Sequence, residues 1–149
     1  MYGSKYRAGD GIERDTRYNG NHVVNFIGGK EFTLGKGLYP WILSTSCRLM
    51  LAGGQRHTPI DLEASREKGY TVRRQELAWS QQYENFIRFD FKASFIKNRK
   101  KSTHTLELDI QNVTNRLNIM GDYYDPDLDG IDTWTQLGII PSLIYRVEF

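Results

Sequence analysis

The chain has 149 residues, a net charge of +2 and 26% charged residues, which suggests one compact domain without the concentrated basic face of a nucleic-acid-binding protein. Aromatic residues make up 13% and there are 14 glycines, a usage that favours strands and tight turns over helices. The single cysteine, Cys47, excludes an intrachain disulfide, and no segment approaches the ~20 consecutive apolar residues of a transmembrane helix.

Three segments in the N-terminal half are expected to form strands. The first is a short stub at Tyr2–Arg7, in which tyrosine and serine alternate with basic residues. The second runs near His22–Phe32, where adjacent apolar pairs leave the face ambiguous, and Val24, Phe26 and Gly28 are favoured as its outward side. In the third, the residues that share one face are Trp41, Leu43, Thr45, Cys47, Leu49 and Leu51.

The clearest alternation runs through Asn85–Lys97. The residues on one face are Ile87, Phe89, Phe91, Ala93 and Phe95, and those on the other are Arg88, Asp90, Lys92 and Ser94. A period of two over this length predicts a β-strand. The next segment repeats the pattern, with Leu106, Leu108 and Ile110 alternating with Glu107, Asp109 and Gln111. The polar turn Asn98–Ser102 between the two segments predicts a β-hairpin.

The last segment also alternates and extends to the final residue. Its apolar face comprises Leu137, Ile139, Pro141, Leu143, Tyr145, Val147 and Phe149. The opposite face carries Ser142, Arg146 and Glu148, with Ile140 and Ile144 as exceptions. Because proline has no backbone N–H, Pro141 is expected to weaken strand pairing locally.

Short and long connections alternate along the chain. The short turns are Phe32–Gly37 and Asn98–Ser102, and the long connections are Asp10–Tyr18, Gln55–Tyr83 and Gly121–Thr135. Outer-membrane barrels combine short periplasmic turns with long extracellular loops, and a tilted strand needs ~9–11 residues to cross the bilayer. We therefore predict an all-β fold: an antiparallel transmembrane β-barrel segment of about six strands, an incomplete barrel with Phe149 in the periplasm.

Alternation alone does not say which face meets water. A soluble β-barrel or β-sandwich ligand-binding module would place the apolar face inside, whereas a membrane barrel would turn it toward lipid. Large aromatic residues near the strand ends and mixed charges on the opposite face favour the membrane barrel. In this interpretation the lumen-facing residues are Arg48, Arg88, Asp90, Lys92, Glu107, Asp109 and Arg146.

Five runs of sequence carry a resemblance to a known family: Asn25–Phe32, Ala52–Asp61, Asp109–Arg116, Gln136–Pro141 and the ending Leu143–Phe149. In this order they resemble the C-terminal barrel of TonB-dependent outer-membrane receptors of the Bacteroidetes type, over nearly the whole chain. The resemblance implies that Tyr145, Val147 and Phe149 form a signal read by the outer-membrane assembly machinery.

The resemblance also implies a function and a location. Such receptors are large barrels closed by an N-terminal plug, and they import siderophores, oligosaccharides or peptides with energy delivered through a TonB box. Residues 1–149 are expected to be the C-terminal part of the barrel, in the cell outer membrane and in contact with its lipids. The plug and the N-terminal strands are absent, so TonB would act only through missing N-terminal parts. No enzymatic activity, catalytic residue, cofactor, metal or nucleic-acid partner is predicted.

Two other patterns have ordinary explanations. The segment Asp125–Gly130 resembles the start of a calcium loop, but Gln136 stands where the bidentate glutamate is required, and a solvated hairpin tip is favoured while calcium stays open. Ser102, His104 and Asp109 are the residue types of a catalytic triad, yet no nucleophile motif accompanies them, so catalysis is not predicted.

Overall fold

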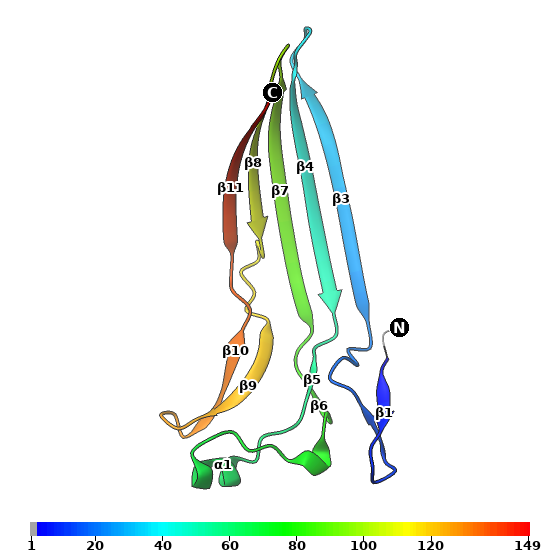
Figure 1. Ribbon diagram of the computed structural model, residues 1–149, viewed down its shortest axis with the longest axis vertical. Helices are drawn as coiled ribbons and strands as arrows, with labels where there is room; N and C mark the ends of the chain where they lie inside the picture. The colour runs from blue at the N-terminus through cyan, green and yellow to red at the C-terminus, as the bar shows by residue number, and fades with distance from the viewer. Residues whose placement is uncertain (1–2) are drawn as a thin grey trace. The chain divides into compact units, whose positions relative to one another are not determined.

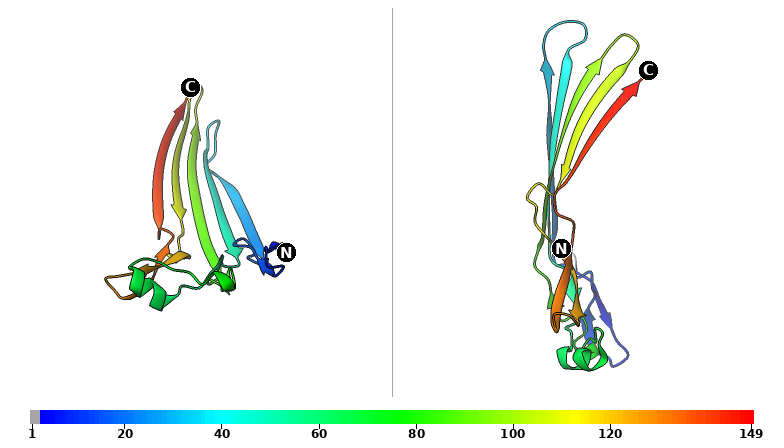
Figure 2. Two further views of the ribbon diagram at one scale, coloured as in Figure 1. Left: turned by 60° about the horizontal axis from the view of Figure 1, so that its bottom comes forward. Right: turned by 90° about the vertical axis from the view of Figure 1, so that its left-hand side faces the viewer.

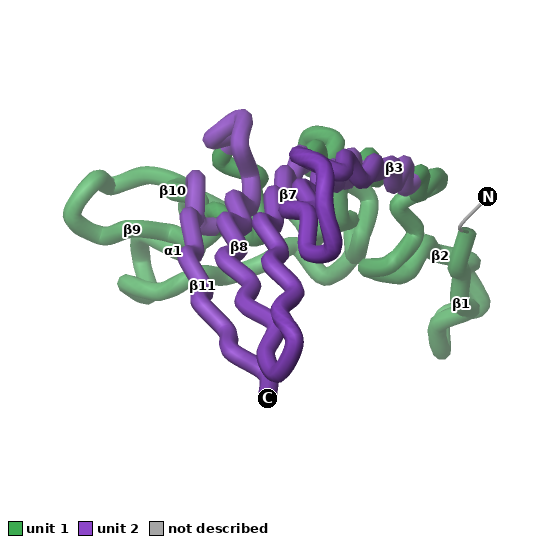
Figure 3. Tube along the Cα trace, turned by 90° about the horizontal axis from the view of Figure 1, so that it is seen from above, with its two compact units in different colours: residues 1–24, 51–87, 117–136 green, residues 25–50, 88–116, 137–149 purple. Residues whose placement is uncertain are grey.

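The computed structural model describes residues 3–149, so Tyr2 of the predicted N-terminal stub lies outside the described residues. The expected all-β fold with antiparallel sheets is confirmed, with one short α-helix besides the strands. The chain divides into two compact units rather than the one suggested by its length (Figure 3). Unit 1 comprises Met1–Val24, Leu51–Ile87 and Leu117–Gln136, and unit 2 comprises Asn25–Met50, Arg88–Arg116 and Leu137–Phe149.

A five-stranded sheet with the strand order β11-β8-β7-β4-β3 accounts for most of unit 2. Its strands are β3 (Val23–Leu34), β4 (Trp41–Ala52), β7 (Phe86–Asn98), β8 (Thr103–Gln111) and β11 (Ile140–Glu148). Each of them lies beside the strand that precedes it within the sheet, which makes the sheet a meander (Figures 1 and 2). The predicted hairpin is confirmed, because β7 and β8 pair antiparallel on either side of a short turn.

The register aligns the apolar residues of neighbouring strands. Leu108 of β8 lies opposite Ala93 of β7 on one side and opposite Leu143 of β11 on the other. Residues that face each other across antiparallel strands project from the same side of the sheet. The same register aligns Lys92, Asp109 and Ser142 on the other side. The sheet therefore has one continuous apolar face and one polar face over these three strands.

The face of β3 that sequence alone left ambiguous follows from its neighbours. Leu34 lines a concavity of about 760 Å³ together with Trp41 and Phe95 of the apolar face. Because side chains alternate along a strand, the even-numbered residues of β3, including Phe26, share that face with Leu34. Val24, Phe26 and Gly28 therefore lie on the apolar face of the sheet.

The apolar face of the sheet is accessible to solvent. Among residues 3–149 the buried hydrophobic side chains are Ile60 and Tyr124, and both belong to unit 1. In unit 2, Phe95 is 43% exposed, Leu108 38% and Leu143 70%. The described part of unit 2 therefore holds its long strands together by backbone pairing and by cross-strand contacts, without a buried hydrophobic core.

The N-terminal stub does not extend this sheet, which corrects the expected six strands to five. Instead, β1 (Lys5–Arg7) pairs with β2 (Glu13–Asp15) in a separate antiparallel hairpin of unit 1. The turn between them explains the difference: Asp10 accepts the backbone N–H of Ile12, and Gly11 has a φ of 78°. Glycine adopts such a conformation without a steric penalty, so the chain reverses soon after β1.

The two long connections of unit 1 contain regular structure of their own. The first contains β5 (Arg56–His57), which pairs with β6 (Gln81–Gln82), together with the helix α1 (Leu62–Lys68) and the 3₁₀ turn η1 (Gln75–Leu77). The second forms a hairpin of β9 (Ile119–Asp125) and β10 (Gly130–Thr135). Within residues 3–149 no helix has the length and apolar character needed to cross a membrane.

Candidate functional site

The polar face of the sheet brings together most of the predicted lumen-facing residues. A pocket of about 320 Å³ in unit 2 is lined by Arg48 of β4, by Arg88, Asp90 and Lys92 of β7, and by Asp109 of β8. These residues converge because alternate positions on three adjacent strands point to the same side. Glu107 and Arg146, the remaining two predicted residues, do not line this pocket.

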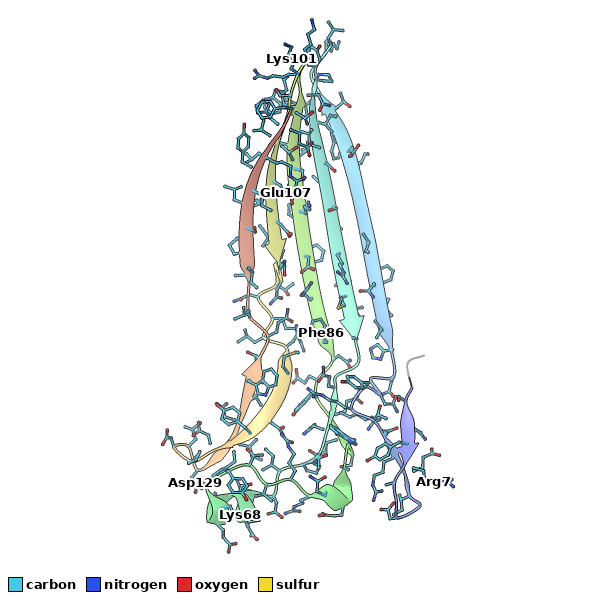
Figure 4. The ribbon with its side chains drawn as sticks, viewed as in Figure 1. Arg7, Lys68, Phe86, Lys101, Glu107 and Asp129 are labelled. Carbon is cyan, nitrogen blue, oxygen red and sulfur yellow. The ribbon has the colours of Figure 1, made fainter. Side chains whose placement is uncertain are left out.

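Glu107 nevertheless belongs to the same face. The side chain of Glu107, which Figure 4 labels, forms a 2.8 Å ion pair with Lys92 Nζ across the β7–β8 pair and accepts a hydrogen bond from Ser94 Oγ. Arg88 pairs with Asp90 along β7 at 2.9 Å. These two ion pairs neutralise four of the charges on this face, which lowers the cost of gathering them in one place.

Arg146 and Arg48 differ in their exposure to solvent. Arg146 is exposed and lies opposite Thr105, on the same side of the sheet as Glu107. The Nε atom of Arg48 is buried and has no hydrogen-bond partner among the described residues. A buried N–H without a partner is costly, so this group is suited to an acceptor from another molecule or chain segment.

The predicted assembly residues lie on and beyond the last strand. Tyr145 and Val147 belong to β11 and lie opposite Leu106 and His104. Phe149 follows the strand and is 103% exposed, so its ring makes no packing contact within the chain. The fold of unit 2 therefore does not depend on the side chain of Phe149.

The three residues considered for a catalytic triad, Ser102, His104 and Asp109, do not have the geometry of a triad. Ser102 Oγ lies 3.1 Å from His104 Nε2, and the other ring nitrogen, Nδ1, lies 2.7 Å from the hydroxyl of Tyr145. Asp109 pairs in register with Lys92 and points to the opposite side of β8 from His104, because the two residues are five positions apart, an odd number. The carboxylate therefore cannot orient the imidazole.

The calcium-like segment is the tip of the β9–β10 hairpin. Asp129 Oδ1 accepts hydrogen bonds from Arg66 Nε at 2.7 Å and from the Tyr124 hydroxyl at 3.0 Å (Figure 4 labels Asp129). Asp125 Oδ1 accepts the backbone N–H of Asp127. These carboxylates therefore already accept hydrogen bonds from α1, from β9 and from the backbone of the turn. Within residues 3–149 no group of three potential ligand side chains is arranged to hold a metal ion.

Sequence reasoning missed a second pocket, of about 260 Å³, which lies within unit 1. At its wall the Asp122 side chain, 8% exposed, accepts hydrogen bonds from the Tyr83 hydroxyl at 2.6 Å and from the Arg73 guanidinium at 2.8 Å. Arg73 also donates to the carbonyl oxygens of Thr58, at 2.6 Å, and of Asp122, at 2.8 Å. A guanidinium with these three hydrogen bonds is held in a fixed orientation.

His57 completes this cluster as a neutral aromatic ring. Its imidazole stacks on the Tyr83 ring with 4.0 Å between centroids, and Nδ1 lies 3.3 Å from Asp122 Oδ2 without hydrogen-bond geometry. Burial lowers the pKa of His57, and the positive charge of Arg73 adds to this effect against the opposing influence of Asp122. Burial and the hydrogen bond to Asp122 raise the pKa of Tyr83.

Asp122 itself stays ionised. Burial alone would raise its pKa, but the hydrogen bonds from Tyr83 and Arg73 and the charge of Arg73 outweigh burial and lower it below 3.8. The cluster is therefore a carboxylate–guanidinium pair shielded by two stacked neutral rings.

The neutral state of His57 predicts a pH-dependent stability. The unfolded chain takes up a proton at His57 near pH 6.5, whereas the folded chain does so only at lower pH, so acidification below 6.5 favours the unfolded state. We expect wild-type protein to lose more stability than His57→Phe, which retains the stack, when urea unfolding is compared at pH 7.5 and 5.5. Equal losses in the two proteins would contradict this assignment.

Comparisons with protein-family models, with curated proteins and with solved structures found no match for this chain.

The Asp122 cluster has little signature in the sequence, because 49 positions separate Asp122 from Arg73. No short motif joins residues so far apart.

Proposed function

We propose that the chain forms part of the wall of a transmembrane β-barrel in the outer membrane, within a TonB-dependent receptor that takes up a ligand. The observation that carries the proposal is the five-stranded meander sheet, whose long strands expose one continuous apolar face. The strands β3, β4 and β7 contain 12, 12 and 13 residues, which meets the length of ~9–11 residues that a tilted strand needs to cross a bilayer.

The two faces of the sheet support this proposal in different ways. A hydrocarbon environment would cover the exposed apolar side chains and remove their unfavourable contact with water. The paired charges of the polar face would line the interior of the barrel, where Lys92 and Glu107 stay bonded across strands. A soluble binding module would require the apolar face to be the buried one.

The assignment to a TonB-dependent receptor rests on the sequence resemblance described above. In the proposed arrangement the short turns at residues 35–40 and 99–102 are periplasmic, and the long connections that contain β5, α1, β6, β9 and β10 are extracellular. The ligand, an iron-chelating compound, an oligosaccharide or a peptide, would pass through a barrel of which this chain supplies one part.

The terminal residue provides a test that separates assembly from stability. In the intact receptor, Phe149→Ala is expected to reduce the amount of barrel recovered in the outer-membrane fraction several-fold, because the assembly machinery would no longer read the ending. The stability of the sheet should change by less than about 0.5 kcal/mol, since the ring of Phe149 is fully exposed. Membrane fractionation and heat-modifiable gel mobility measure the first effect, and urea unfolding measures the second.

Phe149→Tyr is the matched control, because it retains a terminal aromatic ring and should assemble like the wild type. Unchanged outer-membrane recovery of the alanine variant would count against the proposal. So would recovery of the wild-type protein in the soluble fraction without detergent.

A further inference from the structure

We propose that the pocket beside Asp122 binds a small organic oxyanion, a carboxylate or phosphate group carried on a single planar ring. The pocket residues all belong to unit 1, so the inference does not depend on whether the sheet of unit 2 spans a membrane. Its basis is a guanidinium group without a carboxylate partner within residues 3–149, beside aromatic side chains.

Three arginines line the pocket, and two of them are already matched by carboxylates. Arg73 is bonded to Asp122 at 2.8 Å, and Arg56 pairs with Asp15 at 3.1 Å while its Nε donates to the Asn19 carbonyl. Both guanidinium groups are therefore fixed by the protein itself. Because each is paired with a carboxylate, they add little net positive charge to the pocket and offer no free edge to a ligand.

Arg17 is the arginine that remains for a ligand. In the described part of the chain its guanidinium makes one hydrogen bond, from Nε to the neutral amide oxygen of Gln55 at 3.2 Å. This bond orients the side chain and leaves its two terminal nitrogens for another acceptor. A guanidinium edge of this kind matches the two oxygens of a carboxylate or phosphate.

Aromatic side chains form the apolar part of the pocket. Trp79, Tyr83 and Trp134 line it, and Trp134 is 52% exposed, so part of its indole is accessible to a ligand. The indole lies against Gly121 so closely that a methyl group at this glycine would lie within 3 Å of three indole atoms. Glycine at position 121 therefore lets the indole approach the pocket.

The backbone at Trp79 adopts an unusual conformation that a side-chain hydrogen bond stabilises. Trp79 has a φ of 58°, a left-handed conformation that bulky residues rarely adopt. Thr58 Oγ1 accepts its backbone N–H at 3.1 Å and so fixes the conformation. Backbone outliers of this kind cluster at binding sites.

The size of the pocket limits the ligand. Its volume of about 260 Å³ lies below the ~300–1,000 Å³ of pockets for drug-sized compounds. One ring with one oxyanion group is therefore the suitable class. The negative charge of Asp122 does not oppose such a ligand strongly, because Tyr83 and Arg73 already satisfy its carboxylate.

Titration of the full chain in detergent micelles tests the proposal, with tryptophan fluorescence and calorimetry as readouts. The probes are benzoate, phenyl phosphate, inorganic phosphate and the uncharged analogue benzamide. We expect saturable binding of benzoate or phenyl phosphate, weaker binding of inorganic phosphate, and little binding of benzamide. A preference for benzoate identifies a carboxylate site, and a preference for phenyl phosphate identifies a phosphate site.

Arg17→Gln should weaken binding about tenfold or more, because it removes the guanidinium edge. The matched control is Arg7→Gln, an exposed residue of β1 that does not line the pocket, and it should bind like the wild type. Gly121→Ala should also weaken binding by displacing the Trp134 indole, with the circular dichroism spectrum unchanged. Absence of saturable binding, equal affinity for benzamide and benzoate, or unaltered affinity in Arg17→Gln would overturn the proposal.

Discussion

Leu143→Arg is expected to lower the free energy of unfolding by about 2–4 kcal/mol when the protein is embedded in a phospholipid bilayer. Leu143 lies near the middle of β11, in register with Leu108, and is 70% exposed. If the apolar face meets lipid, the guanidinium would be placed at mid-depth in hydrocarbon, where its desolvation is costly. Urea unfolding in bilayers, followed by tryptophan fluorescence, measures the effect.

Ser142→Arg is the matched control for this experiment, because the neighbouring residue points to the polar face. Ser142 lies opposite Asp109, so an arginine there gains a nearby carboxylate and should change stability by less than about 1 kcal/mol. In the absence of a bilayer, both variants should resemble the wild type, since Leu143 is mostly exposed. Equal effects of the two substitutions in the bilayer would show that the two faces are wrongly assigned.

The second large effect is expected at the Asp122 cluster, where Asp122→Ala should destabilise the protein by about 3 kcal/mol. The substitution leaves the Arg73 guanidinium without its counter-charge and the Tyr83 hydroxyl without its acceptor. The expected cost is at the lower end for a broken buried ion pair, because the Arg73 side chain keeps 29% of its surface exposed. Denaturant unfolding at pH 7 measures it.

Asp127→Ala provides the comparison, because this aspartate lies on the exposed tip of the same β9–β10 hairpin and should cost less than about 0.5 kcal/mol. The pKa of Asp122 lies below 3.8, so its stabilising contribution is complete above that pH and is lost as the pH falls further. The gap between wild type and Asp122→Ala should therefore narrow below pH 3.8. Equal costs for both alanine variants at pH 7 would contradict the role assigned to the cluster.

The elements that could be predicted from the sequence are those in which the local pattern and the tertiary environment agree. The alternation in β7 and β8 continues for many residues on both faces, and the turn between them is polar, so the hairpin and its two faces follow directly. The convergence of Arg88, Asp90, Lys92 and Asp109 on one pocket also follows, because it needs only adjacent strands and a period of two.

The helix α1 has capping residues that can be recognised in the sequence. Asp61 caps the first turn by accepting the N–H of Ala64, and Gly69 ends the helix in the left-handed conformation. Such capping residues at both ends of a seven-residue segment could have indicated a helix within a stretch expected to be a loop.

The Asp122 pocket and the N-terminal hairpin could not be predicted, for different reasons. The pocket depends on contacts between β5, β9 and the segment around Arg73, and contacts of such sequence separation leave no periodic signal. The pairing of β1 with β2 depends on a reversal at Asp10 and Gly11, and the three charged residues of β2 are too few to show an alternating pattern.

The strand order of the sheet ends at β3 on one side and at β11 on the other, and each of these strands has one neighbour in the sheet. Each edge thus presents a row of backbone amides and carbonyls that no strand of this sheet bonds. In hydrocarbon such rows cannot stay unsatisfied, because no water is present to replace the missing hydrogen bonds. In the proposed bilayer setting, β3 and β11 must therefore pair with strands from beyond this sheet. A closed barrel would then supply the hydrogen bonds that water cannot supply in hydrocarbon.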